Sequence, residues 1–125
     1  MIMKNNIEIN VEVTYLSDQS DIINKQYAYA YTITITNQGD VGAQIRTRRW
    51  LIQDESGQTE EVIGEGVIGQ QPHLSPGESF QYSSGAIINT ETGTMKGSYG
   101  MISDSGQRFD ADIPEFTLSE PRTLH

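Results

Sequence analysis

The chain has 125 residues, a length that suits one domain with a sizeable hydrophobic core. It has no cysteine, which excludes disulfides, thiolate metal sites and cysteine nucleophiles. Seventeen acidic and eight basic side chains give a formal charge of −9, which argues against extended nucleic-acid binding. No stretch has the apolar length of a signal peptide or a membrane span, so we expect a cytoplasmic protein without membrane contact.

Two segments in the first part of the chain alternate apolar and polar residues. The alternation runs over residues 7–15 and again over residues 27–35, and it is typical of strands with one buried face. The polar residues between them, 17–24, are expected to form a loop. The second segment contains three tyrosines in phase with its isoleucines, so these tyrosines are expected in the core: Tyr27, Tyr29 and Tyr31.

Turn signals recur through the rest of the chain, and no stretch of ten residues has a helical period free of Gly and Pro. Further strands are therefore expected near residues 42–53, 58–66, 78–84, 96–103 and 107–113. About seven strands in a compact chain predict an all-β, immunoglobulin-like (fibronectin type III-like) antiparallel β-sandwich, with a closed barrel as the alternative. We expect one domain over residues 1–125, with Trp50 in its core and residues 114–125 as a C-terminal tail lying along the body.

The densest motif is a Gly-x-Gly-x-x-Gly sequence at residues 64–69. Dinucleotide binding would require a helix after it, and the prolines at 72 and 76 exclude one. The glycines therefore indicate either a kinked strand or tight hairpin, or a binding loop of another kind. If Val67 and Ile68 are exposed at its tip, they would form a small apolar knob for a partner.

A pair of arginines precedes this motif. A four-residue hairpin loop at residues 54–57 would place Arg46 opposite Glu65 and Arg48 opposite Ile63. Arg46 and Arg48 would then share one face, about 6.5 to 7 Å apart, beside the amides of the glycine-rich turn. That arrangement suits a pyrophosphate, a nucleotide or a carboxylate. The alternative is ordinary cross-strand pairing of Arg46 with Glu65, with Arg48 covering Trp50.

Arg49 points to the opposite face from its neighbours unless a bulge intervenes. The candidate contact residues for a protein partner or an anion are therefore those of the two arginine positions and of the glycine-rich segment: Arg46, Arg48, Gly64, Glu65, Gly66, Val67, Ile68, Gly69, Gln71 and Pro72.

Catalytic and metal-binding patterns are weak. Ser83 lies outside any Gly-x-Ser-x-Gly elbow, and His73 and His125 lack a second nitrogen ligand at helical spacing. We therefore predict no enzyme activity and no cofactor. Three aspartates are weak candidates for a hard cation, although solvated acids on an outer face explain them equally simply: Asp104, Asp110 and Asp112.

Several separated motifs make the chain resemble the ApaG family over nearly its whole length: Arg48-Arg49-Trp50, the segment 64–72, Gly93 to Tyr99, and Phe109 to Phe116. The resemblance implies a fibronectin type III-like sandwich. It also implies a genetic link to a diadenosine tetraphosphate hydrolase and, under the name CorD, to cobalt tolerance and magnesium efflux. Similar domains attached to an F-box protein and to a DNA polymerase delta-interacting protein imply protein interaction. The resemblance supplies no catalytic residues.

The sequence therefore favours a non-enzymatic interaction module that presents residues 64–72 and an arginine face to a protein partner, loosely associated with cobalt and magnesium homeostasis. The alternative is a small-molecule sensor or carrier that binds pyrophosphate or a nucleotide through Arg46, Arg48 and backbone amides. Exposed edge strands leave a homodimer open, and the charge of −9 opposes one.

Overall fold

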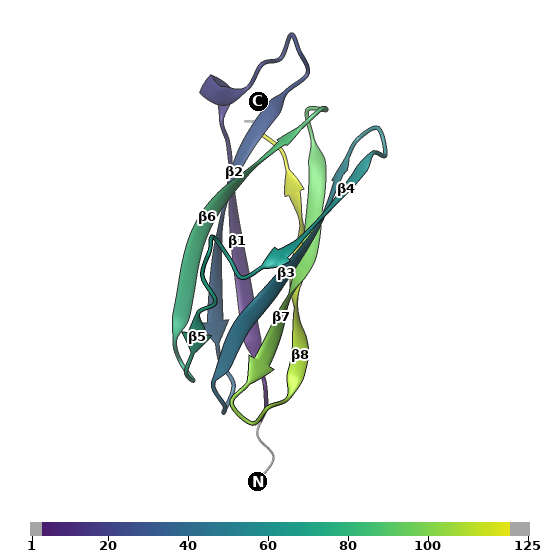
Figure 1. Ribbon diagram of the computed structural model, residues 1–125. Coiled ribbons are helices and arrows are strands. Elements are labelled where there is room, and N and C mark those ends of the chain that lie inside the picture. Colours follow the sequence, from purple (N-terminus) through teal and green to yellow (C-terminus); the bar gives the residue numbers. More distant parts are fainter. Residues whose placement is uncertain (1–3, 121–125) are drawn as a thin grey trace.

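The computed structural model describes residues 4–120, which fold into two antiparallel sheets packed face to face (Figure 1). One sheet has the order β1-β2-β6, and the other has the order β4-β3-β7-β8 with β5 added beside β3. The elements are β1 (Ile7–Tyr15), η1 (Ser17–Gln19), β2 (Tyr27–Asn37), β3 (Ala43–Asp54), β4 (Thr59–Glu65), β5 (His73–Leu74), β6 (Ser79–Ile88), β7 (Gly93–Ser103) and β8 (Arg108–Leu118). The predicted β-sandwich is confirmed.

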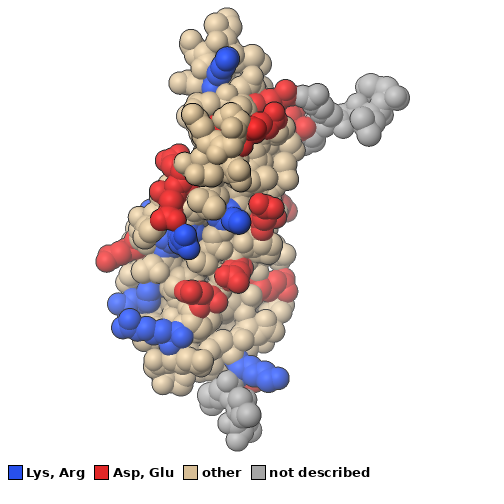
Figure 2. All heavy atoms as spheres, turned by 90° about the vertical axis from the view of Figure 1, so that its right-hand side faces the viewer, with Lys and Arg blue, Asp and Glu red and all other residues tan. Residues whose placement is uncertain are grey.

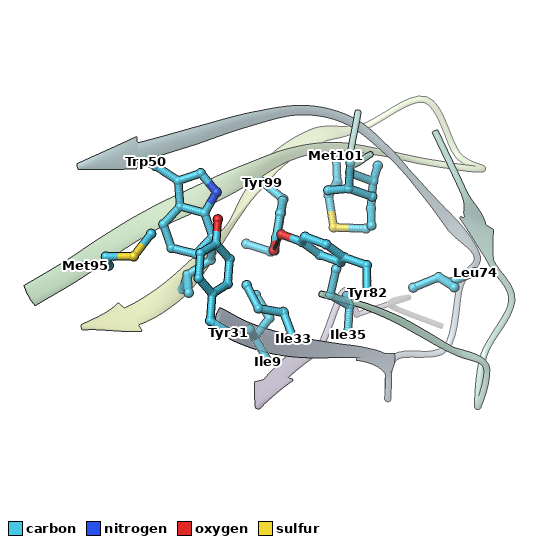
Figure 3. Packing of buried hydrophobic residues seen from close by; sticks show 14 of the residues in the cluster. Ile9, Tyr31, Ile33, Ile35, Trp50, Leu74, Tyr82, Met95, Tyr99 and Met101 are labelled. Carbon is cyan, nitrogen blue, oxygen red and sulfur yellow. Dashed lines mark hydrogen bonds between the residues drawn. The ribbon is translucent and has the colours of Figure 1, made fainter. Parts of the chain in front are cut away.

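The core lies between the two sheets and is rich in aromatic side chains (Figure 3). Trp50 of β3 is 3% exposed, and its ring centroid lies 5.5 Å from that of Tyr31 and 5.9 Å from that of Phe116. Tyr29 and Tyr31 are buried, as their phase with the isoleucines predicts, and Tyr27 packs against the cluster from its margin. Aromatic packing thus fills the place that a disulfide takes in antibody domains.

A hydrogen bond between two buried tyrosines links the sheets. The hydroxyl oxygens of Tyr82 on β6 and Tyr99 on β7 lie 2.5 Å apart. Burial raises the pKa of Tyr82 to about 12 and raises the pKa of Tyr99 well above its ordinary value. Both hydroxyls therefore stay protonated at neutral pH, and each satisfies the other inside the core.

The last strand is longer than the sequence predicts. Residues 114–118, expected to belong to the tail, continue β8 through Leu118. A register shift between Met95 and Gly97 of β7 accommodates Pro114, since proline in a sheet is tolerated at bulges and on edge strands. The rest of the expected tail, residues 121–125 with His125, lies outside the described residues. Within residues 4–120 there is no helix of the length and hydrophobicity that crossing a bilayer requires.

Candidate functional site

A bulge in β3 determines where the candidate site forms. The pairing of β3 with β7 shifts by one residue between Ile45 and Thr47, so Arg46 is the extra residue. The freed carbonyl oxygen of Arg46 accepts hydrogen bonds from the Gly66 N–H, at 2.8 Å, and from the Gln71 side-chain amide, at 3.0 Å. The bulge therefore anchors the glycine-rich segment to the five-stranded sheet.

The turn between β3 and β4 sets a pairing register one residue away from the expected one. The Asp54 N–H donates to the Gln58 carbonyl at 3.0 Å, and the Asp54 carboxylate accepts from the N–H groups of Ser56 and Gln58. These bonds, led by that of the Ser56 hydroxyl, hold the pKa of Asp54 below its ordinary value. The predicted loop, with Asp54 inside it, is therefore wrong by one residue: Asp54 bonds to Gln58, and Gln53 lies opposite Thr59.

The shifted register changes which residues face each other. Arg48 lies opposite Gly64, and Thr47 lies opposite Glu65. The predicted pairing of Arg46 with Glu65 is therefore wrong, and within residues 4–120 Arg46 takes part in no ion pair. Arg49 instead binds Glu61 at 2.8 Å on the outer face of the sheet, meaning the face turned away from the other sheet.

Arg46 and Arg48 do not share a face of β3, because the bulge at Arg46 interrupts the alternation of side chains along the strand. Arg48 lies opposite the buried Tyr99 and two residues from Trp50, so its side chain starts on the inner face. Its guanidinium Nη1 donates to the carbonyl oxygens of Glu65, at 2.9 Å, and Gly66, at 3.0 Å. Arg48 therefore secures the glycine-rich segment from inside and is not an open anion clamp.

Gly64 is required beside that guanidinium. A Cβ at this position would lie 2.8 Å from the guanidinium carbon of Arg48. The absence of a side chain at position 64 therefore lets Arg48 pass across β4 and reach the two carbonyls beyond it.

Residues 67–70 form a two-residue β-hairpin turn. The N–H of Val67 donates to the Gln70 carbonyl at 2.8 Å, and the reverse bond measures 2.9 Å. The central residues have positive φ values, 43° at Ile68 and 76° at Gly69, which correspond to a type I′ turn. The tight hairpin predicted for the Gly-x-Gly-x-x-Gly motif is thus observed, and the segment continues into β5, so no helix follows it.

The tip of this hairpin, meaning Ile68 and Gly69, exposes one apolar residue. Ile68 is 55% exposed, whereas Val67 is fully buried in the core. Of the two residues predicted to form an apolar knob, only Ile68 is exposed. The prediction is wrong for Val67, whose side chain faces the core.

The second leg of the hairpin is also tied to β3. The Ile45 N–H donates to the Pro72 carbonyl at 3.0 Å, and the Gln44 side-chain amide donates to the Gln71 carbonyl at 3.1 Å. Three backbone N–H groups of the segment that was predicted to bind an anion are already hydrogen-bonded: those of Gly66, Val67 and Gln70 donate to carbonyl groups of the protein. These amides stabilise the hairpin and are not free for a ligand.

Beside the hairpin, the outer face carries a pocket of about 390 Å³. Arg46, Glu65 and Gln71 line it from the hairpin side, and Arg108 and Asp110 line it from β8. Figure 2 shows the side of the molecule that lies to the right in Figure 1, where basic and acidic side chains are interleaved. The sequence placed the first three residues in one candidate set, but it missed Arg108, which only the register of β8 brings to them.

The three candidate aspartates do not form a cluster. Among residues 4–120 there is no group of three His, Cys, Asp or Glu side chains suited to hold a metal ion. Asp104 is hydrogen-bonded to the Nε2 atom of His73 at 2.8 Å, whereas Asp110 and Asp112 lie on β8 opposite Gly100 and Ser98.

Comparison with known proteins places the hairpin inside a shared region. The family described as the ApaG domain matches residues 17–103. The Protein ApaG of Nitrosomonas eutropha is 52% identical over 98% of this chain and 96% of its own length, and that of Pseudomonas entomophila is 53% identical over 95% and 94%. A crystal structure of an ApaA protein from Bordetella pertussis superposes with a TM-score of 0.93 at 42% identity, covering 98% of this chain and 100% of that one.

Proposed function

The chain belongs to the ApaG family, and from this premise we propose that it is a non-enzymatic interaction module that contacts a protein partner through the hairpin tip at Ile68. One observation carries the proposal: an exposed, β-branched residue holds a positive φ of 43°. Isoleucine is a poor choice for this position of a type I′ turn, where asparagine, aspartate and glycine are favoured.

Within residues 4–120, the side chain of Ile68 gains little packing that could offset its backbone strain. A backbone conformation of this kind costs about 1–3 kcal/mol for a residue other than glycine. With 55% of its surface exposed, the Ile68 side chain gains little from packing against its own protein. A residue that lowers stability without strengthening the core supports a role in contact with another molecule.

The hairpin is ordered before any partner arrives. Arg48 holds its first leg through two carbonyls, and the Arg46 carbonyl holds both legs through Gly66 and Gln71. A tip fixed in this way loses little conformational freedom on binding. An aliphatic anchor at Ile68, with polar side chains in the pocket beside it, resembles the apolar centre and polar rim of protein interfaces.

Site-specific photocrosslinking in living cells tests this proposal. A photoreactive amino acid at position 68 is expected to form an adduct with a defined partner, identifiable by mass spectrometry. Position 63 supplies the matched control, because Ile63 is another exposed isoleucine, 67% accessible, on β4. No adduct at position 68, or the same adducts at both positions, would count against the proposal.

Anion binding is a second candidate function, and one observation favours it. Arg46 and Arg108 line the same pocket, and among residues 4–120 neither forms an ion pair. Two free guanidinium groups suit pyrophosphate or a nucleotide. This version uses Arg108 where the sequence suggested Arg48.

Calorimetric titration with pyrophosphate and with ATP tests the second candidate. Binding should weaken in both Arg46→Ala and Arg108→Ala and persist in Arg49→Ala. No heat from either ligand at millimolar concentration would reject the candidate. The cobalt and magnesium association, the cytoplasmic location and the homodimer remain predictions.

A further inference from the structure

Strand β6 has an unpaired edge whose backbone directions can be derived. The Leu16 N–H donates to the Ala28 carbonyl at 2.9 Å, so the even-numbered residues of β2 direct their backbone groups to β1. Its odd-numbered residues therefore bond the even-numbered residues of β6, in agreement with the bond from the Asn37 N–H to the Glu78 carbonyl. The odd-numbered residues of β6, including Gly85 and Ile87, consequently direct their N–H and C=O groups away from β2.

No other strand of the described chain pairs with that edge. β6 also lacks the usual protection of an edge, since residues 79–88 contain neither a charged residue nor a proline. Apart from the two-residue β5, the other edge strands do carry such residues: Glu8 and Glu12 on β1, Glu60, Glu61 and Glu65 on β4, and Asp110, Asp112 and Pro114 on β8. An unprotected edge of ten residues is thus specific to β6 within residues 4–120.

Strands β6 and β4 belong to different sheets and do not pair (Figure 1). A groove is lined by residues of both strands. Its main hollow measures about 500 Å³ and is lined by Ile52 and Val62 from the facing sheet and, beyond β6, by Leu16, Gln19, Ala28 and Tyr29. The consecutive residues 85–87 all line it. Because side chains alternate along a strand, three consecutive lining residues mean that the groove follows the backbone edge itself.

The charge of the groove indicates the kind of partner. Glu60 lines the main hollow, and together with Asp54 it lines a smaller one of about 100 Å³ that continues it. Among the described residues, no Lys or Arg lines either hollow. The protein as a whole carries a formal charge of −9, so a second copy would be repelled and a cationic segment would be attracted.

We propose that the β6 edge is a β-augmentation site for an extended, cationic segment of a partner protein. The segment pairs with the free backbone groups of Gly85 and Ile87 and places alternate aliphatic side chains over Ile52 and Val62. A Lys or Arg of the segment reaches Glu60 and Asp54. This surface is separate from the hairpin tip and does not depend on its function.

Designed peptides provide the first test. A peptide of about eight residues that alternates isoleucine with lysine should bind the full-length protein, and the amide resonances of residues 83, 85 and 87 should shift most in an NMR titration. An otherwise identical peptide with glutamate in place of lysine should bind about tenfold more weakly. N-methylation of the alternate peptide amides that face β6 should abolish binding, whereas methylation of the others should not.

Two proline variants provide the second test. Ile87→Pro removes an outward N–H without touching a bond to β2, and it should lower the peptide affinity about tenfold. Ser79→Pro removes another outward N–H of β6, outside the residues that line the groove, and should change the affinity by less than about twofold. Ile87→Thr keeps the N–H and should retain binding, which separates backbone pairing from the loss of the side chain.

Four results would overturn the proposal: no binding of the lysine peptide at millimolar concentration, equal binding of the glutamate peptide, unchanged affinity in Ile87→Pro, or a dimer in sedimentation that Ile87→Pro dissociates. The last result would assign the edge to a second copy of the chain. Ile68→Asn should leave peptide binding unchanged, so a failure here and a failure of the hairpin proposal can be told apart.

Discussion

The two turns that flank β4 are held in place by different means. In the turn of residues 54–58, the Asp54 carboxylate binds the backbone of Ser56 and Gln58, and Gly57 takes the positive φ of 90°. In the turn of residues 67–70, an isoleucine takes a positive φ, and the bonds that hold its legs come from Arg48 and from the bulge in β3.

The first turn is thus shaped mainly by the side chain of Asp54, although Glu55 also bonds to Thr90 and Thr92, whereas the second turn is held mainly by residues outside it. Asparagine or glycine at position 68 would give a more stable protein, because these residues adopt a positive φ at lower cost. The presence of isoleucine there supports the proposal that this side chain contacts another molecule. The following experiments probe this difference, from the largest expected effect to the smallest.

Alanine at Gly66, the residue just before the second turn, and at Gly57 of the first turn should separate them most clearly. A Cβ at Gly66 would lie 2.2 Å from the Gln70 carbonyl oxygen, whereas a Cβ at Gly57 meets nothing within 4 Å. Urea unfolding should show a loss of about 3 kcal/mol for Gly66→Ala and of about 1 kcal/mol for Gly57→Ala, where only the positive φ is penalised. Equal losses would mean that the second turn is no more constrained than the first.

Removal of the internal support should come next. Arg48→Ala leaves the carbonyls of Glu65 and Gly66 without their donor and should lower the free energy of unfolding by about 2 kcal/mol. The matched control is Arg49→Ala, which breaks a mostly exposed ion pair with Glu61 and should cost less than about 0.5 kcal/mol. If both variants behave alike, Arg48 does not hold the hairpin.

Relief of strain at the tip should produce a smaller change of opposite sign. Ile68→Asn accepts the positive φ more readily and should raise the free energy of unfolding by about 1 kcal/mol. Ile63→Asn, at an equally exposed isoleucine in regular strand geometry, should bring no gain. A loss of stability in Ile68→Asn would show that the residue serves the fold after all.

Acid should loosen only the first turn. Because the pKa of Asp54 is lowered in the folded protein, its contribution is complete above the unfolded value of about 3.9 and is lost as the pH falls through the lower folded value. Amide exchange at Gln58 should therefore accelerate below about pH 3, whereas Gln70, whose turn is supported by an arginine, should stay protected. Simultaneous loss of both protections would remove the distinction.

The same contrast explains what could be predicted from the sequence. Alternation with a period of two residues predicted the paired strands of the sandwich and the burial of Tyr29 and Tyr31, because burial of one face dominates strand energetics. The register of β3 with β4 was missed by one residue, since it depends on the bonds of the Asp54 side chain. The bulge at Arg46 leaves no periodic signal, and it alone separates Arg46 from Arg48.

The sequence identified most of the residues of the candidate site, but it did not predict how they are arranged in space. The glycine-rich segment was singled out, but which of Val67 and Ile68 is exposed depends on the direction in which the hairpin leaves β4. Arg108 lies in the same pocket as Arg46 only because β8 pairs with β7. The two arginines are separated by about 60 residues of sequence, so no local pattern could predict that they are neighbours.

The central claim is that Ile68 lowers the free energy of unfolding of the protein and contacts a partner. The most direct test measures two quantities on Ile68→Asn: its free energy of unfolding, and the amount of the crosslinked partner that the immobilised protein retains. We expect stability to rise while retention falls about tenfold relative to Ile63→Asn. A more stable variant that retains the partner in full would contradict the claim.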